Sequence, residues 1–109
     1  MENSFKISGY VSFSEETAFN KSSVCRFSLS VSKKEKDTDN WTSAFLSCEA
    51  WIKNEEVEKF TTLQKGNRVT VEGFFKPEEW TDKEGKKHNR VTLAATKFYL
   101  TENKETEQK

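Results

Sequence analysis

Apolar and polar residues alternate with a period of two along most of this chain, which is the pattern of β-strands that bury one face. The alternation predicts five strands, over 5–13, 24–33, 41–52, 68–75 and 90–100. We expect a polar loop over 14–23 and a charged turn over 34–40. The fourth strand should end before Pro77, after which a long polar hairpin turns through 81–86.

Between the third and fourth strands the pattern predicts a short helix. Asn54 is a typical helix N-cap, the two glutamates that follow it suit the first turn, and Gly66 suits the end. The apolar stripe of this helix comprises Val57, Phe60 and Leu63. The order β-β-β-α-β-β predicts an all-β protein, a five-stranded OB-fold Greek-key barrel with one helix between strands 3 and 4.

The alternation also separates an inner face from an outer face. The expected inner residues are Phe5, Ile7, Gly9, Val11 and Phe13 in the first strand, Phe27, Leu29 and Val31 in the second, and Ala44, Leu46, Cys48, Ala50 and Ile52 in the third. The outer set of the third strand includes Phe45 and Trp51 beside serines and Glu49. Phe74 belongs to the outer set of the fourth strand, and Trp80 lies in the polar hairpin. A solvated face needs no such rings.

Exposed rings on an OB barrel are a platform on which the bases of single-stranded nucleic acid stack, at ~1–3 kcal/mol for each base. The candidate stacking residues are Phe45, Trp51, Trp80 and Phe74. The candidate phosphate-binding residues are Lys53, Lys33, Lys34, Lys83, Lys86, Lys87 and Arg90. Two alternatives stay open: the rings pack on a neighbouring subunit or cover a barrel end, and the lysines are solvated charges. We interpret Tyr10 and Tyr99 as structural.

Composition limits these interpretations. The 109 residues predict one domain, with the OB fold over 1–100 and a short polar tail over 101–109 that has no apolar residue and is expected to be disordered. Hydrophobic and charged residues each make up 33%, so the core is small and some of the nine phenylalanines should lie on the surface. The 18 basic and 18 acidic residues cancel, so any binding of nucleic acid must rely on the local charge pattern.

Other function classes are less compatible with the sequence. Cys25 and Cys48 have no CxxC spacing and are predicted to be reduced in an intracellular protein, with a disulfide as the alternative. Without a membrane-spanning run or a signal peptide, we expect a cytoplasmic, nucleoid-associated protein. His88, the one histidine, is expected to be solvated in a charged loop, and no catalytic, metal-binding or phosphate-binding motif appears. We therefore predict no enzyme, no cofactor and no metal.

The chain resembles the bacterial single-stranded DNA-binding protein family over roughly residues 3–100. The matching elements are the opening Asn3 and the strand that reaches Gly9, the motif FSLSV, Trp51-Ile52-Lys53, Lys65-Gly66, and VTVEG followed by WTDKEG. The resemblance implies an OB barrel that binds single-stranded DNA without strong sequence preference, as a homotetramer or else a dimer, in replication, recombination or repair. It places family stacking residues at Phe45, Trp51 and Trp80, and a family lysine at Lys53.

Three departures from the family pattern change these expectations. An aromatic that some members carry after the second strand falls near Lys34 and Glu35, so one stacking site is expected to be lost. The segment before Trp80 is acidic, Pro77-Glu78-Glu79, where a basic segment is common. The tail TENKETEQK lacks the acidic, hydrophobic-ended tip through which the family recruits repair and replication enzymes, so such recruitment is not expected. We interpret the chain as truncated or as a divergent member of the family.

A second function stays open beside DNA binding. A primosome-like OB module would keep the barrel for protein assembly and bind DNA weakly or not at all. The zero net charge and the acidic segment before Trp80 favour this module, whereas the set of exposed rings favours DNA. Salt separates the two, because binding of single strands weakens with a log–log slope of ~0.7 for each neutralised phosphate.

Overall fold

Five long strands close into a barrel in the order β1-β2-β3-β5-β4 in the computed structural model, which describes residues 2–101. The elements are β1 (Phe5–Ala18), β2 (Ser22–Lys34), β3 (Trp41–Lys53), the 3₁₀ helix η1 (Asn54–Leu63), β4 (Arg68–Thr81) and β5 (Lys87–Leu100). Neighbouring strands pair antiparallel, except β3 and β5, which run parallel where they meet. The predicted OB-fold barrel with one helix between strands 3 and 4 is confirmed.

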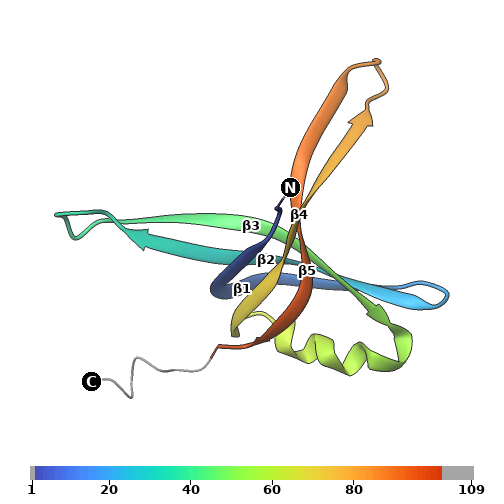
Figure 1. Cartoon of the computed structure of the whole chain (residues 1–109), viewed down its shortest axis with the longest axis horizontal. Helices are drawn as coiled ribbons and strands as arrows, with labels where there is room; N and C mark the ends of the chain where they lie inside the picture. The colour runs from blue at the N-terminus through green and yellow to red at the C-terminus, as the bar shows by residue number, and fades with distance from the viewer. Residues whose placement is uncertain (1, 102–109) are drawn as a thin grey trace.

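Three hairpins extend from the barrel as arms (Figure 1). They are the β1–β2 arm, the β2–β3 arm and the β4–β5 arm. The polar loop predicted over 14–23 was wrong, because Ser14–Ala18 pairs with Ser23–Phe27 in the β1–β2 arm. None of the residues of Ser14–Ala18 is buried, so this part of the strand has no buried face to produce an apolar alternation. The tail predicted over 101–109 falls outside the described residues beyond Thr101.

The sequence suggested that the fourth strand ends before Pro77, but the strand continues through it. Pro77 lies within β4 and pairs with Val91 of β5. The pairing of β4 with β1 ends at Gly73, so at Pro77 the edge of β4 that does not face β5 has no strand beside it. A proline, which lacks the backbone N–H, is tolerated at such an edge. As a result, β4 carries its side chains from the barrel out to Trp80 without a break.

A β-bulge in β1 reverses one predicted orientation. The register of β1 against β2 shifts between Val11 and Phe13. A bulge adds one residue to the strand, so the alternation of faces changes there. Val11 remains in the core, but Phe13, which was predicted to point inward, is 54% exposed.

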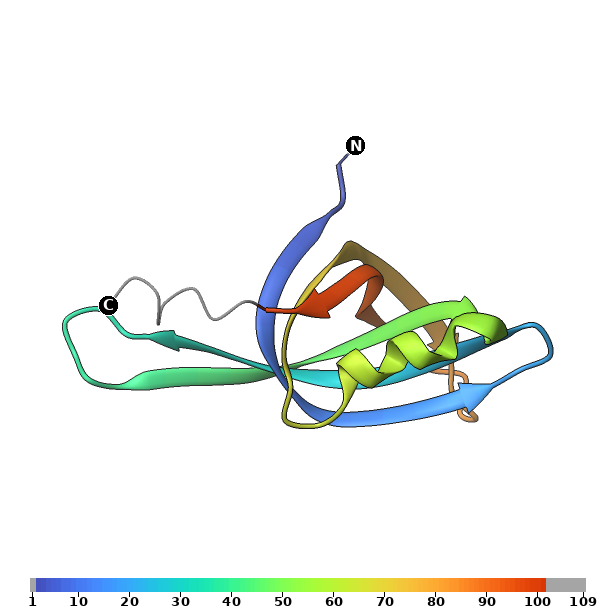
Figure 2. The same ribbon diagram turned by 90° about the horizontal axis from the view of Figure 1, so that it is seen from below.

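The core lies inside the barrel and beneath η1. Its buried residues include Val11, Leu29, Val69 and Val71 from the strands and Phe60 and Leu63 from η1. Figure 2 shows η1 along the side of the barrel, and Phe60 stacks on Phe98 of β5 with 6.2 Å between ring centroids. Ala44 is exposed, contrary to the prediction, because it belongs to the β2–β3 arm beyond the barrel. No helix within residues 2–101 is long and apolar enough to cross a membrane.

Asn54 has a different role from the predicted N-cap. It is the first residue of η1, and the preceding residue, Lys53, caps the helix without a side-chain hydrogen bond. The Asn54 amide nitrogen instead donates to the carbonyl oxygens of Phe19 and Asn20, at 3.1 and 3.2 Å. Asn54 therefore ties the start of η1 to the tip of the β1–β2 arm. A cap requires the residue before the first turn, and this sequence places the asparagine one position too late.

The two cysteines are free thiols buried in the barrel, in agreement with the reduced state that was predicted. Burial raises the pKa of the Cys48 thiol to about 12, and it also raises the pKa of Cys25. Both side chains therefore act as small apolar residues of the core.

Gly73 is required where β4 and β5 approach most closely. A Cβ atom at this position would lie 1.8 Å from the carbonyl oxygen of Ala94. The register of β4 against β5 also shifts between Glu72 and Gly73, so the two backbones cross at an irregular point. Only a residue without a side chain fits here.

We predict that Gly73→Ala lowers the free energy of unfolding by at least about 1–3 kcal/mol, because the clash is with backbone atoms that must shift. Urea denaturation followed by circular dichroism measures the change. Glu79→Ala, an exposed position on the same strand, is the control and should unfold like the parent. Equal midpoints for Gly73→Ala and the parent would contradict the proposed role of this close approach.

Candidate nucleic-acid interface

The outer surface of β1, β2 and β3 consists of rows that contain one residue from each strand. The rows are Tyr10–Ser30–Phe45, Phe13–Ser28–Ser47, Glu15–Arg26–Glu49 and Thr17–Val24–Trp51. Directly paired residues of antiparallel strands project from the same side of a sheet. We call the surface formed by these four rows the ring face, because it carries rings from β1 and β3. The register of three strands thus gathers side chains that are far apart in the sequence.

Phe45 and Trp51 are exposed on the ring face, with Phe45 at 67%, in agreement with their predicted outward orientation. The indole Nε1 of Trp51 donates to Glu49 Oε2 at 3.2 Å. Phe19, from the tip of the β1–β2 arm, stacks on Trp51 with ring centroids 5.5 Å apart. The indole is therefore held in one orientation, and only the side away from Phe19 is open to a planar ligand.

An ion pair joins the ring face to the β4–β5 arm. Lys76 Nζ of β4 lies 3.0 Å from Glu49 Oε2 of β3. Glu49 belongs to the outer set of β3, as predicted, but it is only 6% exposed, because Lys76 and Trp51 cover it. Beside this contact, Trp51 and Phe74 line one hollow of about 530 Å³. The fold thus brings together two of the predicted stacking residues.

Trp80 lies farther out on the β4–β5 arm, where it is exposed. Its ring stacks on His88 with centroids 5.3 Å apart and planes 17° apart, and Arg90 Cζ lies 5.4 Å from the indole centroid. The sequence suggested that His88 is a solvated side chain in a loop, but this prediction was wrong. His88 belongs to β5, and its Nε2 lies 2.8 Å from Asp82 Oδ2. The hydrogen bond from His88 lowers the pKa of Asp82.

Two of the cations near these rings, Lys76 and Arg90, are paired with acids. Glu78 Oε1 accepts from Arg90 Nε at 2.8 Å, and Glu78 Oε2 lies 3.9 Å from Lys76 Nζ. The hydrogen bond from Arg90 lowers the pKa of Glu78. We call Glu49, Lys76, Glu78 and Arg90 the acid–base cluster. Its two acids and two bases cancel, so the centre of the surface has no formal net charge.

The structure distributes the other predicted phosphate-binding residues over separate places. Lys53 follows Trp51 by two residues on β3 and is exposed. Lys33 and Lys34 lie near the tip of the β2–β3 arm, where Lys34 Nζ is 4.0 Å from Asp39. The remaining three, Lys83, Lys86 and Lys87, lie at the tip of the β4–β5 arm. These lysines do not form one patch, and their role in binding phosphate stays a prediction.

Sequence reasoning missed several residues on this surface. Arg26 lies between Glu15 and Glu49 on the ring face and is exposed, and among residues 2–101 it has no ion-pair partner. Its position opposite the inward Phe27 was visible in the alternation. Phe13 was missed because no pattern marks the bulge that turns it outward. Within the same described range, no group of three metal-ligating side chains is present.

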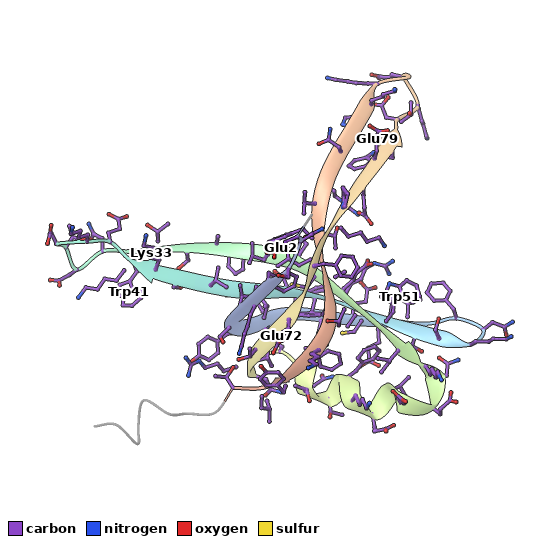
Figure 3. The ribbon with its side chains drawn as sticks, viewed as in Figure 1. Glu2, Lys33, Trp41, Trp51, Glu72 and Glu79 are labelled. Carbon is purple, nitrogen blue, oxygen red and sulfur yellow. The ribbon has the colours of Figure 1, made fainter. Side chains whose placement is uncertain are left out.

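Trp41 is the most informative exposed ring that was not among the predicted stacking residues. Figure 3 shows Trp41 and Trp51 at opposite ends of β3. Trp41 pairs across the β2–β3 arm with Lys34 and is 63% exposed. The arm therefore carries an exposed ring on β3, on the strand that faces Lys34.

The barrel with its ring face defines an OB-fold protein that displays aromatic side chains on an outer surface. The family model described as "Single-strand binding protein family" matches residues 3–101, and the chain belongs to this family. Among solved structures, the Plasmodium falciparum SSB in complex with ssDNA is similar, with a TM-score of 0.69 and 15% identity. The match covers 94% of this chain and 97% of that chain, and at this identity it supports the fold alone. No curated protein matches the sequence significantly.

Proposed function

We propose that this chain binds single-stranded DNA without strong sequence preference, by stacking bases on exposed rings and holding phosphates with nearby cations. The observation that carries the proposal is the continuous surface formed by the ring face and the β4–β5 arm, which presents Phe45, Trp51, Phe74 and Trp80. Membership of the single-strand binding family supports it. The solved Plasmodium falciparum SSB, which is in complex with ssDNA, shares this fold.

In this proposal the rings contribute most of the affinity. A base stacks on the open side of Trp51, and further bases stack on Phe45, Phe74 and Trp80. Because every base has a planar face, such contacts give little preference for sequence. The Glu49 carboxylate and Phe19 hold the Trp51 indole in place, so little side-chain entropy is lost when a base stacks on it.

Phosphates would contact cations that border the rings. Lys53 and Arg26 flank Trp51 on the ring face, and the lysines of the two arm tips extend the path outward. Arg90 is available only if a phosphate replaces Glu78 as its partner. We therefore expect a shallower salt dependence than the number of lysines and arginines suggests.

The competing function is an OB module for protein assembly. The zero net charge and the pairing of Lys76 and Arg90 with acids favour this alternative. We propose DNA binding instead because a protein interface would need the rings to lie on an apolar surface. In the row of Phe45, however, Ser30 separates this ring from Tyr10. We also propose a homo-oligomer, a tetramer or else a dimer, acting in replication, recombination or repair. Light scattering measures its mass, and a monomer would overturn that assembly.

Tryptophan fluorescence titrated with oligo-dT at low and moderate salt tests the function directly, because the three tryptophans all lie on β3 or β4. We expect quenching at low salt that weakens as salt rises. If low salt gives no change in fluorescence and no binding in a filter or anisotropy assay, DNA binding is contradicted. The rings would then be assigned to a protein interface.

We predict that Trp51→Ala and Trp80→Ala each weaken binding of oligo-dT about 5- to 150-fold, which corresponds to the loss of ~1–3 kcal/mol of stacking. Fluorescence anisotropy of labelled oligo-dT measures the affinity. Tyr99→Ala removes an exposed ring outside this surface and serves as the control. If either tryptophan variant binds oligo-dT with the affinity of Tyr99→Ala, the substituted tryptophan does not stack on a base.

We predict that Glu78→Gln strengthens binding of oligo-dT about two- to fivefold, because Arg90 and Lys76 lose an anionic partner of modest strength. The log–log salt slope should steepen by up to ~0.7 for each phosphate gained. Glu79→Gln is the matched control, since it removes the same charge from the neighbouring exposed residue. Equal affinities for the two variants would mean that Glu78 does not compete with phosphate.

A further inference from the structure

Two of the candidate stacking tryptophans are held in place in different ways. The indole N–H of Trp51 donates to Glu49, whereas among residues 2–101 the indole N–H of Trp80 donates no hydrogen bond. The orientation of Trp80 therefore depends on the side chains that lie against its ring. These are His88, which stacks on it with planes 17° apart, and Arg90, whose Cζ lies 5.4 Å from the indole centroid.

His88 is in turn fixed by the turn at the tip of the β4–β5 arm. Its Nε2 donates to Asp82 Oδ2 at 2.8 Å. The other carboxylate oxygen of Asp82, Oδ1, accepts from the backbone N–H groups of Glu84 and Lys86, both at 2.9 Å. A continuous series of contacts therefore runs from the backbone of the turn through Asp82 and His88 to the indole of Trp80.

The imidazole of His88 has few charged neighbours. Among residues 2–101, β5 pairs at this position with β4 alone, because its pairing with β3 is confined to residues 93–95. On these two strands and their turn, Asp82 contacts the imidazole and Arg90 lies beside the same indole. Glu78 pairs with Arg90 and balances its charge. A proton on His88 therefore gains an anionic partner in Asp82 and places a cation against an aromatic ring.

We propose that His88 is a positioning residue for Trp80 and that its protonation strengthens the binding of single-stranded DNA on this arm. This inference rests on the proposed function. Histidine side chains change charge between about pH 5 and 8, and His88 is the one histidine in the chain. The protonated ring forms an ion pair with Asp82 and a cation–π contact with Trp80, so the indole is held more firmly. It also adds a positive charge beside the bound strand.

The direction of the effect follows from the charge of DNA. Because a polyanion favours the charged imidazole, binding of DNA should take up a proton, and affinity should rise as pH falls through the titration of His88. The neutral imidazole can still donate through Nε2 to Asp82. Binding at higher pH is therefore weakened and not abolished.

The test measures affinity for oligo-dT, whose thymines do not titrate in this range, by fluorescence anisotropy at about pH 8 and about pH 5.5 and constant ionic strength. The parent should bind about two- to fivefold more tightly at the lower pH. His88→Phe keeps a ring against Trp80 but has no proton to gain, so it should bind equally at both. If the parent and His88→Phe have the same pH profile, the proposal is overturned.

Asn89→His in the His88→Phe background is the matched control. It returns a histidine to the arm at the neighbouring exposed position, which pairs with Glu79 instead of Trp80. We expect little pH dependence from this variant. A rise in affinity as large as that of the parent would mean that any added charge suffices, and it would overturn the positioning role.

The fluorescence of Trp80 tests the contact without DNA. In a Trp41→Phe/Trp51→Phe variant, Trp80 is the one remaining tryptophan. A protonated imidazole quenches a contacting indole more strongly than a neutral one does. Emission should therefore fall from about pH 8 to about pH 5.5, and adding His88→Phe should abolish the change. Emission that does not depend on pH would contradict the coupling of His88 to Trp80.

The outcomes distinguish a failure of this inference from a failure of the proposed function. If the parent binds oligo-dT equally at both pH values and Trp80→Ala still weakens binding, the role of His88 is wrong and DNA binding stands. If the parent binds no oligo-dT at either pH, the proposed function itself fails.

Discussion

The register of β2 against its two neighbours determines the surface on which the proposed function depends. β2 pairs with β1 on one side and with β3 on the other, so each of its outward residues selects one partner from each strand. A slip of one residue would turn every outward side chain to the other face. The bulge at Val11 and Phe13 adjusts this register once, and it places Phe13 on the ring face rather than in the core.

Charge balance gives the surface its second property. The zero net charge of the chain is repeated locally, because Glu49 and Glu78 lie among the rings and pair with Lys76 and Arg90. These carboxylates also have structural roles: Glu49 orients Trp51 and links β3 to β4. A surface of this kind favours stacking over phosphate contact, since Lys76 and Arg90 beside the rings already have partners.

The sequence predicted the barrel and the orientation of Phe45 and Trp51 because β2 and β3 pair without a register shift, so their period of two continues from end to end. Phe13 could not be predicted, since a bulge leaves no mark in the apolar pattern. The strand at 14–18 was hidden because both of its faces are polar, and Pro77 suggested a break because a sequence does not tell an edge strand from a central one. Arg26 was predictable from the alternation. The pairing of Lys76 with Glu49 was not, since it joins strands far apart in the chain.

The three arms extend beyond the core, so the sequence is constrained differently in the barrel and in the distal parts of the arms (Figure 1). Residues inside the barrel must fit one another, whereas the distal residues of an arm need only maintain a hairpin. A ring can therefore stand on either strand of an arm without repacking of the core, as it could at the paired positions of Lys34 and Trp41. Related chains can thus present similar surfaces from positions that do not align, and position-by-position comparison will underestimate how much of a binding surface they share.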